Sequence, residues 1–211
     1  MNNFKLILIG LSSSLLLGLP PSSSAYTPQR GNVHTILGPL AYKTNYGGVA
    51  AKDAITFQGI SWIILGDVSD HGSVKITTSF MDKIFFLRDG NYVVAERAQV
   101  VQASAGYMYW FNKRFGTSLS LYTSYPLGAS DKIHDDFPTT INTPKTTAQE
   151  NSETGLDFAI QGELWQSGRY ALITEGRYLW SLTKKSGEFA DQYGFMIGIR
   201  YFFQGQDTPR E

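Results

Sequence analysis

The last long apolar stretch of the chain, residues 192–203, constrains the fold more than any other segment. Its even-numbered positions are mostly polar or small, while its odd-numbered positions are large and apolar: Tyr193, Phe195, Ile197, Ile199, Tyr201 and Phe203. This period of two predicts a β-strand with one apolar face, about as long as a tilted strand that crosses a bilayer. In water its edge would promote aggregation, and in a bilayer every backbone group needs a partner. We therefore expect a closed barrel in which this strand pairs with the first one.

The same stretch resembles the last strand of the small outer-membrane β-barrel proteins of Gram-negative bacteria, of the OmpA and OmpX type. In that family the strand carries a signal for the barrel assembly machinery, and Gln192, Gly194, Ile197 and Ile199 match its polar, glycine and apolar positions. The resemblance implies an all-β fold, an eight-stranded antiparallel up-and-down transmembrane β-barrel, which we expect at residues 34–203. Chains of this family usually end at the last aromatic residue of the strand, whereas here residues 204–211 follow Phe203. We expect these eight residues to form a short periplasmic tail.

The start of the chain has the pattern of a secretory signal peptide. Lys5 precedes an apolar run from Leu6 to Leu19, and the small residues Ser23 and Ala25 stand at the positions before a cut. We expect residues 1–25 to be removed, so that Tyr26 starts the mature protein and residues 26–33 form a periplasmic lead-in. The alternative is an N-terminal membrane anchor, but the apolar run is short for a span and contains a run of serines.

Composition excludes several classes of protein. The chain has no Cys, which rules out disulfides, thiolate metal sites and a lipoprotein anchor. Its 18 Lys and Arg residues balance 18 Asp and Glu residues, so nothing indicates a nucleic-acid partner. After residue 25 no apolar stretch approaches the length of a transmembrane helix.

Turn residues divide the mature chain into eight expected strands. Successive links fall alternately on the two sides of the barrel, and one side has the links at 44–53, 89–90, 126–151 and 184–188. The shorter links at 66–72, 112–114 and 166–168 fall on the other side with both termini. Since the longest link of such barrels lies outside the cell, we expect these two sides to be extracellular and periplasmic, respectively.

Two hairpins have a register that can be predicted. Asp89-Gly90 is a type I′ turn signal, which sets Lys83 opposite Glu96 and Asp82 opposite Arg97. The alternative to this hairpin is a short helix at Met81 to Arg88. Gln166-Ser167-Gly168 fits a three-residue hairpin loop, which sets Asp157 directly opposite Arg177.

The less apolar face of the strands carries charge and therefore favours a membrane barrel with a polar lumen over a soluble, lipocalin-like barrel with an apolar interior. We expect lumenal ion pairs among six of these residues: Asp157, Arg177, Lys75, Glu163, Glu175 and Arg200. Aromatic residues near the strand ends predict two interfacial belts. The periplasmic belt comprises Tyr107, Tyr109, Phe111, Tyr170, Tyr201 and Phe203, and the outer belt comprises Tyr42, Tyr46, Tyr125, Trp180 and Tyr193.

An eight-stranded barrel is filled by its own side chains, which favours a structural or surface-interaction role in which the loops are presented outside. A narrow channel for small or hydrophobic solutes is the alternative. A lipid A-modifying enzyme is disfavoured because no His lies on a strand at the outer rim, and His134 with Ser130 is the nearest approach to a catalytic pair. Asp131–Asp136 is a candidate cation site, and a solvated loop is the simpler interpretation.

We therefore expect no catalytic, cofactor or metal residues. The expected partners are outer-membrane lipids and lipopolysaccharide, the barrel assembly machinery during biogenesis, and an extracellular partner that the sequence does not identify.

Overall fold

The computed structural model describes residues 26–138, 143–149 and 152–203. The expected signal peptide at 1–25 and the expected tail at 204–211 lie outside the described residues. No helix within the described ranges is long and apolar enough to cross a membrane.

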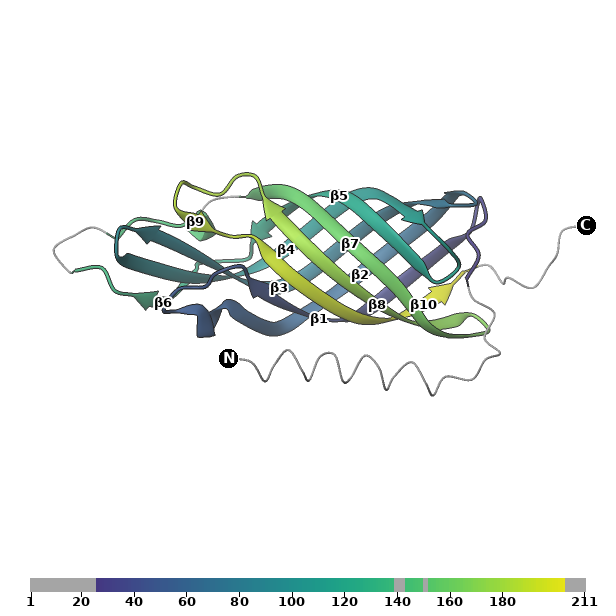
Figure 1. Cartoon of the computed structure of the whole chain (residues 1–211), viewed down its shortest axis with the longest axis horizontal. Helices are drawn as coiled ribbons and strands as arrows, with labels where there is room; N and C mark the ends of the chain where they lie inside the picture. The colour runs from purple at the N-terminus through teal and green to yellow at the C-terminus, as the bar shows by residue number, and fades with distance from the viewer. Residues whose placement is uncertain (1–25, 139–142, 150–151, 204–211) are drawn as a thin grey trace, which may run out of the picture.

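Eight long strands of the described chain close an antiparallel up-and-down barrel (Figure 1), and this confirms the predicted fold class. Each strand pairs with the next along the chain, and the last pairs with the first from His34↔Phe202 to Thr44↔Gln192. The strands are β1 (Val33–Thr44), β2 (Ile55–Ser69), β3 (Gly72–Asp89), β4 (Tyr92–Trp110), β5 (Phe115–Pro126), β7 (Glu153–Ser167), β8 (Tyr170–Ser181) and β10 (Gln192–Phe202). We call the end where β1 begins and β10 ends the terminal end, and the opposite end the loop end.

The loop end carries more structure than predicted. The segment 126–151 was expected to be a long polar loop, but it contains β6 (Asp131–Asp135) and the 3-10 helix η2 (Thr147–Gln149). β6 pairs with β4, and the two-residue strand β9 (Glu188–Phe189) pairs with β3. A further 3-10 helix, η1 (Ala51–Ala54), precedes β2. Figure 1 shows β6 and β9 beside the part of the β3–β4 hairpin that extends beyond the barrel.

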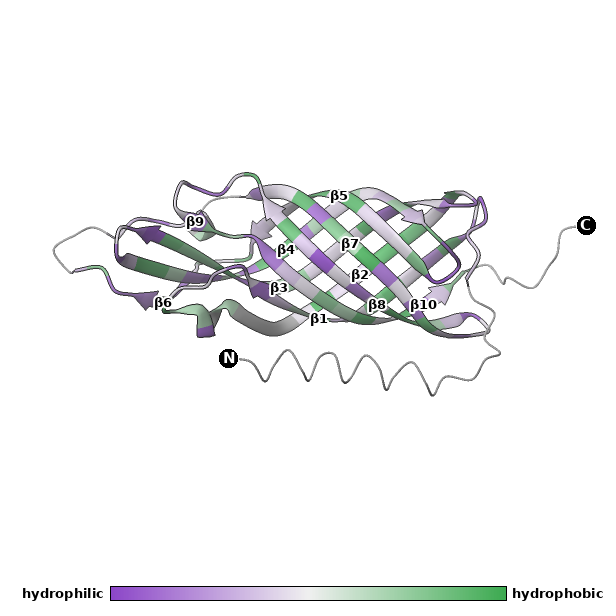
Figure 2. Cartoon of the chain, viewed as in Figure 1, coloured by the Kyte–Doolittle hydropathy of each residue, from purple (hydrophilic) through white to green (hydrophobic). Residues whose placement is uncertain are grey.

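The barrel is apolar outside and polar inside, which identifies it as transmembrane. Along β3, Val74 and Ile76 face outward with 45% and 49% of their surface exposed, whereas the intervening Lys75 is 1% exposed. The same alternation recurs on the other spanning strands, and Figure 2 shows it as bands of opposite hydropathy. Such an apolar outer wall is stable against lipid and unstable against water.

The β2–β3 connection is tighter than predicted. A turn was expected over Gly66–Gly72, but β2 continues to Ser69 and the connection consists of Asp70 and His71. Asp67 is one of the polar residues, with Asp70 and His71, that suggested an earlier turn. Its carboxylate is buried inside the strand, where it accepts a hydrogen bond from Ser73 Oγ at 2.6 Å.

The predicted register of the β3–β4 hairpin was wrong by two residues. Arg88 pairs with Val93 and Lys83 pairs with Ala98, so neither expected charge pair lies directly opposite across the strands. Gly90 has a φ of 60° and occupies the first central position of the turn, while no described non-glycine residue has a positive φ. These features indicate a type II′ turn at Gly90–Asn91 in place of the expected type I′ turn.

The β7–β8 hairpin shows the same kind of displacement. Its connection is Gly168–Arg169, and a β-bulge lies between Glu163 and Trp165. Gly168 has a φ of 55° and again stands first in a two-residue turn. The expected pairing of Asp157 with Arg177 is therefore wrong in register, because Asp157 lies opposite Leu179.

The aromatic belts are present with two corrections at the loop end. Tyr125, Trp180 and Tyr193 are exposed on the outer wall as expected, but Tyr42 and Tyr46 are buried. Tyr42 is on the inward face of β1. Tyr46 follows β1 and stacks on Phe86 with ring centroids 4.2 Å apart, in a small apolar core outside the barrel that also contains Ile84, Val93 and Ala95.

Candidate functional site

The lumen of the barrel is the candidate site, because buried charged groups concentrate there. Along the barrel axis they form three layers, which we name by position. The central layer contains Lys75, Asp157, Glu175 and Arg177; the terminal layer contains Asp67, Glu163 and Arg200; the loop-end layer contains Lys83 and Glu153.

The central layer is a connected ion-pair network. Lys75 Nζ lies 2.6 Å from Glu175 Oε2 and also donates to Ser118 Oγ at 3.1 Å. Arg177 binds Asp157 through two nitrogens, with Nε 3.2 Å from Oδ1, and its Nε also lies 3.5 Å from Glu175 Oε1. All four side chains are almost completely buried, so their charges are compensated by one another instead of by bulk water.

The terminal layer combines charge with aromatic rings. Arg200 Nη1 donates to Glu163 Oε2 at 2.9 Å, and its guanidinium carbon lies 4.7 Å from the centre of the Tyr26 ring. The Trp110 indole donates to Ser73 Oγ at 2.9 Å. Residues 26–33 were predicted only as a polar lead-in, whereas Tyr26 is wholly buried and helps to fill this end of the lumen.

The loop-end layer is a compact cluster around one carboxylate. Lys83 Nζ donates to both oxygens of Glu153 at 2.7 and 2.6 Å. Tyr122 Oη and Ser124 Oγ each donate to the same carboxylate at 3.1 Å. Every acceptor position of Glu153 is thus used by groups from two strands, β3 and β5, which fixes Lys83 across the lumen.

A cover lies over this layer, formed by η2 and the segment that precedes β10. Glu188 accepts hydrogen bonds from Thr147 N at 2.7 Å and from Thr147 Oγ1 at 2.5 Å. The preceding Thr146 donates its hydroxyl to Glu96 of β4, and Lys185 Nζ donates to Lys145 O at 2.9 Å. These contacts tie the β5–β7 link, the β8–β10 link and the β3–β4 hairpin together at the loop end.

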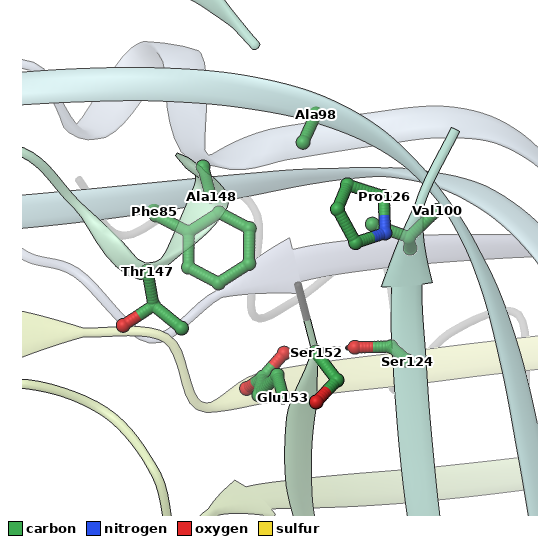
Figure 3. Close-up of a pocket in the computed structure, with 9 residues that line it drawn as sticks. All are labelled: Phe85, Ala98, Val100, Ser124, Pro126, Thr147, Ala148, Ser152 and Glu153. Atoms are coloured by element: carbon green, nitrogen blue, oxygen red, sulfur yellow. Dashed lines mark hydrogen bonds between the residues drawn. The ribbon is translucent and has the colours of Figure 1, made fainter. Parts of the chain in front are cut away.

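A small pocket separates the cover from the loop-end layer. Its volume is about 10 Å³, roughly the room that one water molecule needs, and its lining is mainly apolar. Figure 3 shows Phe85 and Pro126 on its walls, Ala148 of η2 above, and the Glu153 carboxylate beside Ser124 and Ser152. The arrangement offers a small apolar space that ends on a charged and hydroxylated floor.

The structure brings together all six residues proposed for lumenal ion pairs. They form the pairs Lys75–Glu175, Arg177–Asp157 and Arg200–Glu163. In the proposed assembly signal, Gln192 faces inward and Ile197 and Ile199 face outward on β10. Sequence reasoning missed the pair Lys83–Glu153. The signal that could have found Lys83 was its odd position on β3, which it shares with the inward-facing Lys75.

The three His residues do not converge on a site. His34 is buried beside Tyr26, His71 lies in the β2–β3 turn, and His134 Nε2 lies 3.9 Å from Asp136 Oδ2 in the loop-end region. Among the described residues, no group of three or more His, Asp or Glu side chains is arranged to hold a metal ion.

Comparisons with known proteins show similarity only in structure. The sequence matches no protein-family model and no curated protein. The attachment invasion locus protein Ail of Yersinia pestis is 10% identical over 83% of this chain and 100% of its own, with a TM-score of 0.48. The outer membrane protein OprG of Pseudomonas aeruginosa is 10% identical over 85% of this chain and 99% of its own, with a TM-score of 0.49.

Proposed function

We propose that this protein is an integral outer-membrane β-barrel whose lumen is structural and whose loop end forms an ordered extracellular surface for interaction. Residues 1–25 direct secretion, and Gln192, Gly194, Ile197 and Ile199 are read by the barrel assembly machinery. The terminal end faces the periplasm. Outer-membrane lipids and lipopolysaccharide surround the apolar wall, and we assign no enzymatic activity to the chain.

The observation that carries this proposal is the filled lumen beneath an ordered cover. The largest fully buried side chains include Trp110, Arg200, Tyr26, Tyr122, Lys75 and Lys83, all of which point into the lumen. Ion pairs cross it in three layers, so ion flow would require several buried pairs to separate. Separating a buried pair is costly, which favours a structural role for these charges over a conducting one.

The ordered loop end supports an interaction role. β6 and η2 belong to the β5–β7 link and β9 belongs to the β8–β10 link, but pairing holds β6 to β4 and β9 to β3, and a hydrogen bond joins η2 to β9. A surface that is ordered before binding loses less conformational entropy when a partner binds. The loop end is therefore better suited to recognition than a set of independent loops would be.

A narrow channel is the second candidate, and the pocket in Figure 3 favours it. In that case the pocket is an entrance for a small, partly apolar solute, and η2 must move before the solute can pass Lys83 and Glu153.

Single-channel recording in planar bilayers separates the two candidates. We expect no stepwise conductance from the wild-type protein. A variant with Tyr26→Ala and Trp110→Ala, which removes two large lumenal side chains, is the positive control for an opened lumen. The variant Glu188→Ala releases the cover alone and is expected to remain closed, because the ion-pair layers are intact. Stepwise conductance from the wild type would support the channel and contradict the structural role.

Location is tested independently. Cell fractionation is expected to recover the protein in the outer membrane, and unboiled samples are expected to migrate differently from boiled ones because the folded barrel resists detergent. Recovery in the soluble periplasm without a gel shift would contradict the proposal.

A further inference from the structure

The backbone nitrogen of Tyr26 is held at a fixed place inside the barrel. The Tyr26 ring stacks on Phe202 with centroids 5.3 Å apart and meets the Trp110 ring edge-on at 5.0 Å. Its hydroxyl donates to Asp67, and the guanidinium of Arg200 lies against its face. Because the side chain is wholly buried by these contacts, the main chain at this residue is fixed as well.

That nitrogen faces a carboxylate. Tyr26 N donates to Glu163 Oε1 at 3.4 Å, while the other oxygen of Glu163 accepts from Arg200 at 2.9 Å. Glu163 is 6% exposed, so the two groups meet away from bulk water. One side of the carboxylate thus has a cation as its partner, and the other side has a backbone nitrogen.

The terminal layer contains fewer buried cations than carboxylates. Among the described residues, the central layer pairs two cations with two carboxylates, and the loop-end layer pairs one with one. The terminal layer sets Arg200 against both Asp67 and Glu163, with Arg114 as a further cation at the exposed rim. A buried carboxylate without a full countercharge is costly, so this layer has a place for one more cation.

We propose that proteolytic maturation supplies this cation. Hydrolysis of the peptide bond between Ala25 and Tyr26 adds water, leaves a carboxylate on Ala25 and frees the nitrogen of Tyr26, which takes up a proton. The new α-ammonium pairs with Glu163 inside the barrel. The inference depends on the expected signal peptide at residues 1–25, and it gives the cleavage point a structural purpose beyond export.

The first test is the mass of the protein extracted from membranes. The expected mass is that of residues 26–211 with a free α-amine. A different first residue would overturn the proposal, because the ammonium would then lie elsewhere.

The second test measures coupling between the amine and Glu163. The chain 26–211 is compared with the same chain acetylated at its α-amine before refolding, at near-neutral pH, where this amine reacts ahead of lysine because its pKa is lower. Acetylation is expected to lower the urea midpoint of unfolding. In the Glu163→Gln background, this shift is expected to fall at least twofold.

The matched control for this cycle is Glu153→Gln, which neutralises a buried carboxylate of the loop-end layer. There the full acetylation shift is expected, because Glu153 does not contact Tyr26. Equal shifts in the wild type, Glu163→Gln and Glu153→Gln would show that acetylation acts by its bulk alone, and would overturn the ion pair.

A third measurement does not depend on whether any variant folds. In the folded wild-type protein, the α-amine is expected to react with an acylating reagent at least tenfold more slowly than in the urea-unfolded chain. An amine that reacts at the unfolded rate is exposed, and that result would overturn the proposal.

Discussion

Arg177 and Asp157 meet diagonally across two neighbouring strands. Arg177 on β8 lies opposite Ala159, and Asp157 on β7 lies opposite Leu179, so the two residues are offset by one inward-facing position. The long guanidinium spans that offset and binds both carboxylate oxygens of Asp157. Diagonal neighbours on one face of a sheet lie within reach of long side chains, which explains why the contact forms without direct opposition.

We predict that Arg177→Met destabilises the folded barrel by about 3–5 kcal/mol, because it leaves the buried Asp157 without its main cation. Adding Asp157→Leu is expected to restore part of this loss. Recovery is incomplete because Arg177 also lies 3.5 Å from Glu175, which loses a neighbour in both variants. Equilibrium unfolding in urea of the reconstituted protein provides the double-mutant cycle. Purely additive effects would mean that the pair does not contribute as a unit.

The outward face of β10 gives a test of depth in the membrane. Ile197 lies in the middle of the strand and Phe203 follows its end, and both side chains are about half exposed on the outer wall. Arg at Ile197 is expected to cost roughly 2–4 kcal/mol, and Arg at Phe203 about 0–1 kcal/mol, since the cost falls toward the interface. The measurement is the free energy of folding into bilayers, and equal costs at both positions would contradict the assigned depths.

The inward and outward faces were predictable from the sequence even where the register was not. The β3–β4 hairpin was displaced by two residues, as Lys83 opposite Ala98 illustrates. The β7–β8 hairpin was displaced by two residues on the barrel side of its bulge, as Asp157 opposite Leu179 shows. Because the side-chain period of a strand is two, such a displacement changes the partner of each residue but leaves its face unchanged. Lys75 and Asp157 were therefore assigned to the lumen correctly, although their cross-strand neighbours were not.

The cover at the loop end was not predictable, because its order comes from contacts between distant segments. Residues 126–151 are rich in Thr, Pro and Asp and show no period of a strand or helix. Thr147 is ordered by Glu188, which is 41 positions away, and β6 is ordered by the edge of β4. Tyr26 was missed for a related reason, since the rings that bury it come from β4 and β10.

The turn at Gly168 gives a prediction with a matched control. Gly168→Ala is expected to destabilise the barrel by about 1–2 kcal/mol, because its φ of 55° is unfavourable for a residue with a side chain. Gly176→Ala on β8 is the control, since an added Cβ there meets nothing within 4 Å. Urea unfolding of the two variants checks the difference. A loss at Gly176 as large as that at Gly168 would contradict the turn assignment.

Asp135 of β6 gives a prediction for the loop end outside the membrane. Its carboxylate accepts a hydrogen bond from Lys132 Nζ at 2.7 Å, and this contact is the main reason that its pKa lies below the ordinary 3.8. The same carboxylate also accepts hydrogen bonds from Phe137 N and Thr143 Oγ1. Because the pKa of Asp135 is lower in the folded protein than in the unfolded chain, these contacts stabilise the folded loop end at pH values above the unfolded pKa of 3.8. The stabilisation is lost as the pH falls below 3.8 and through the pKa of the folded protein. The measurement is an NMR titration of the Asp135 carboxyl carbon, whose midpoint is expected to rise in Lys132→Met. The control is Arg97→Met, which removes only the exposed pair with Asp131 and is expected to leave the midpoint unchanged. A midpoint that does not respond to Lys132→Met would show that Lys132 does not hold Asp135 in solution.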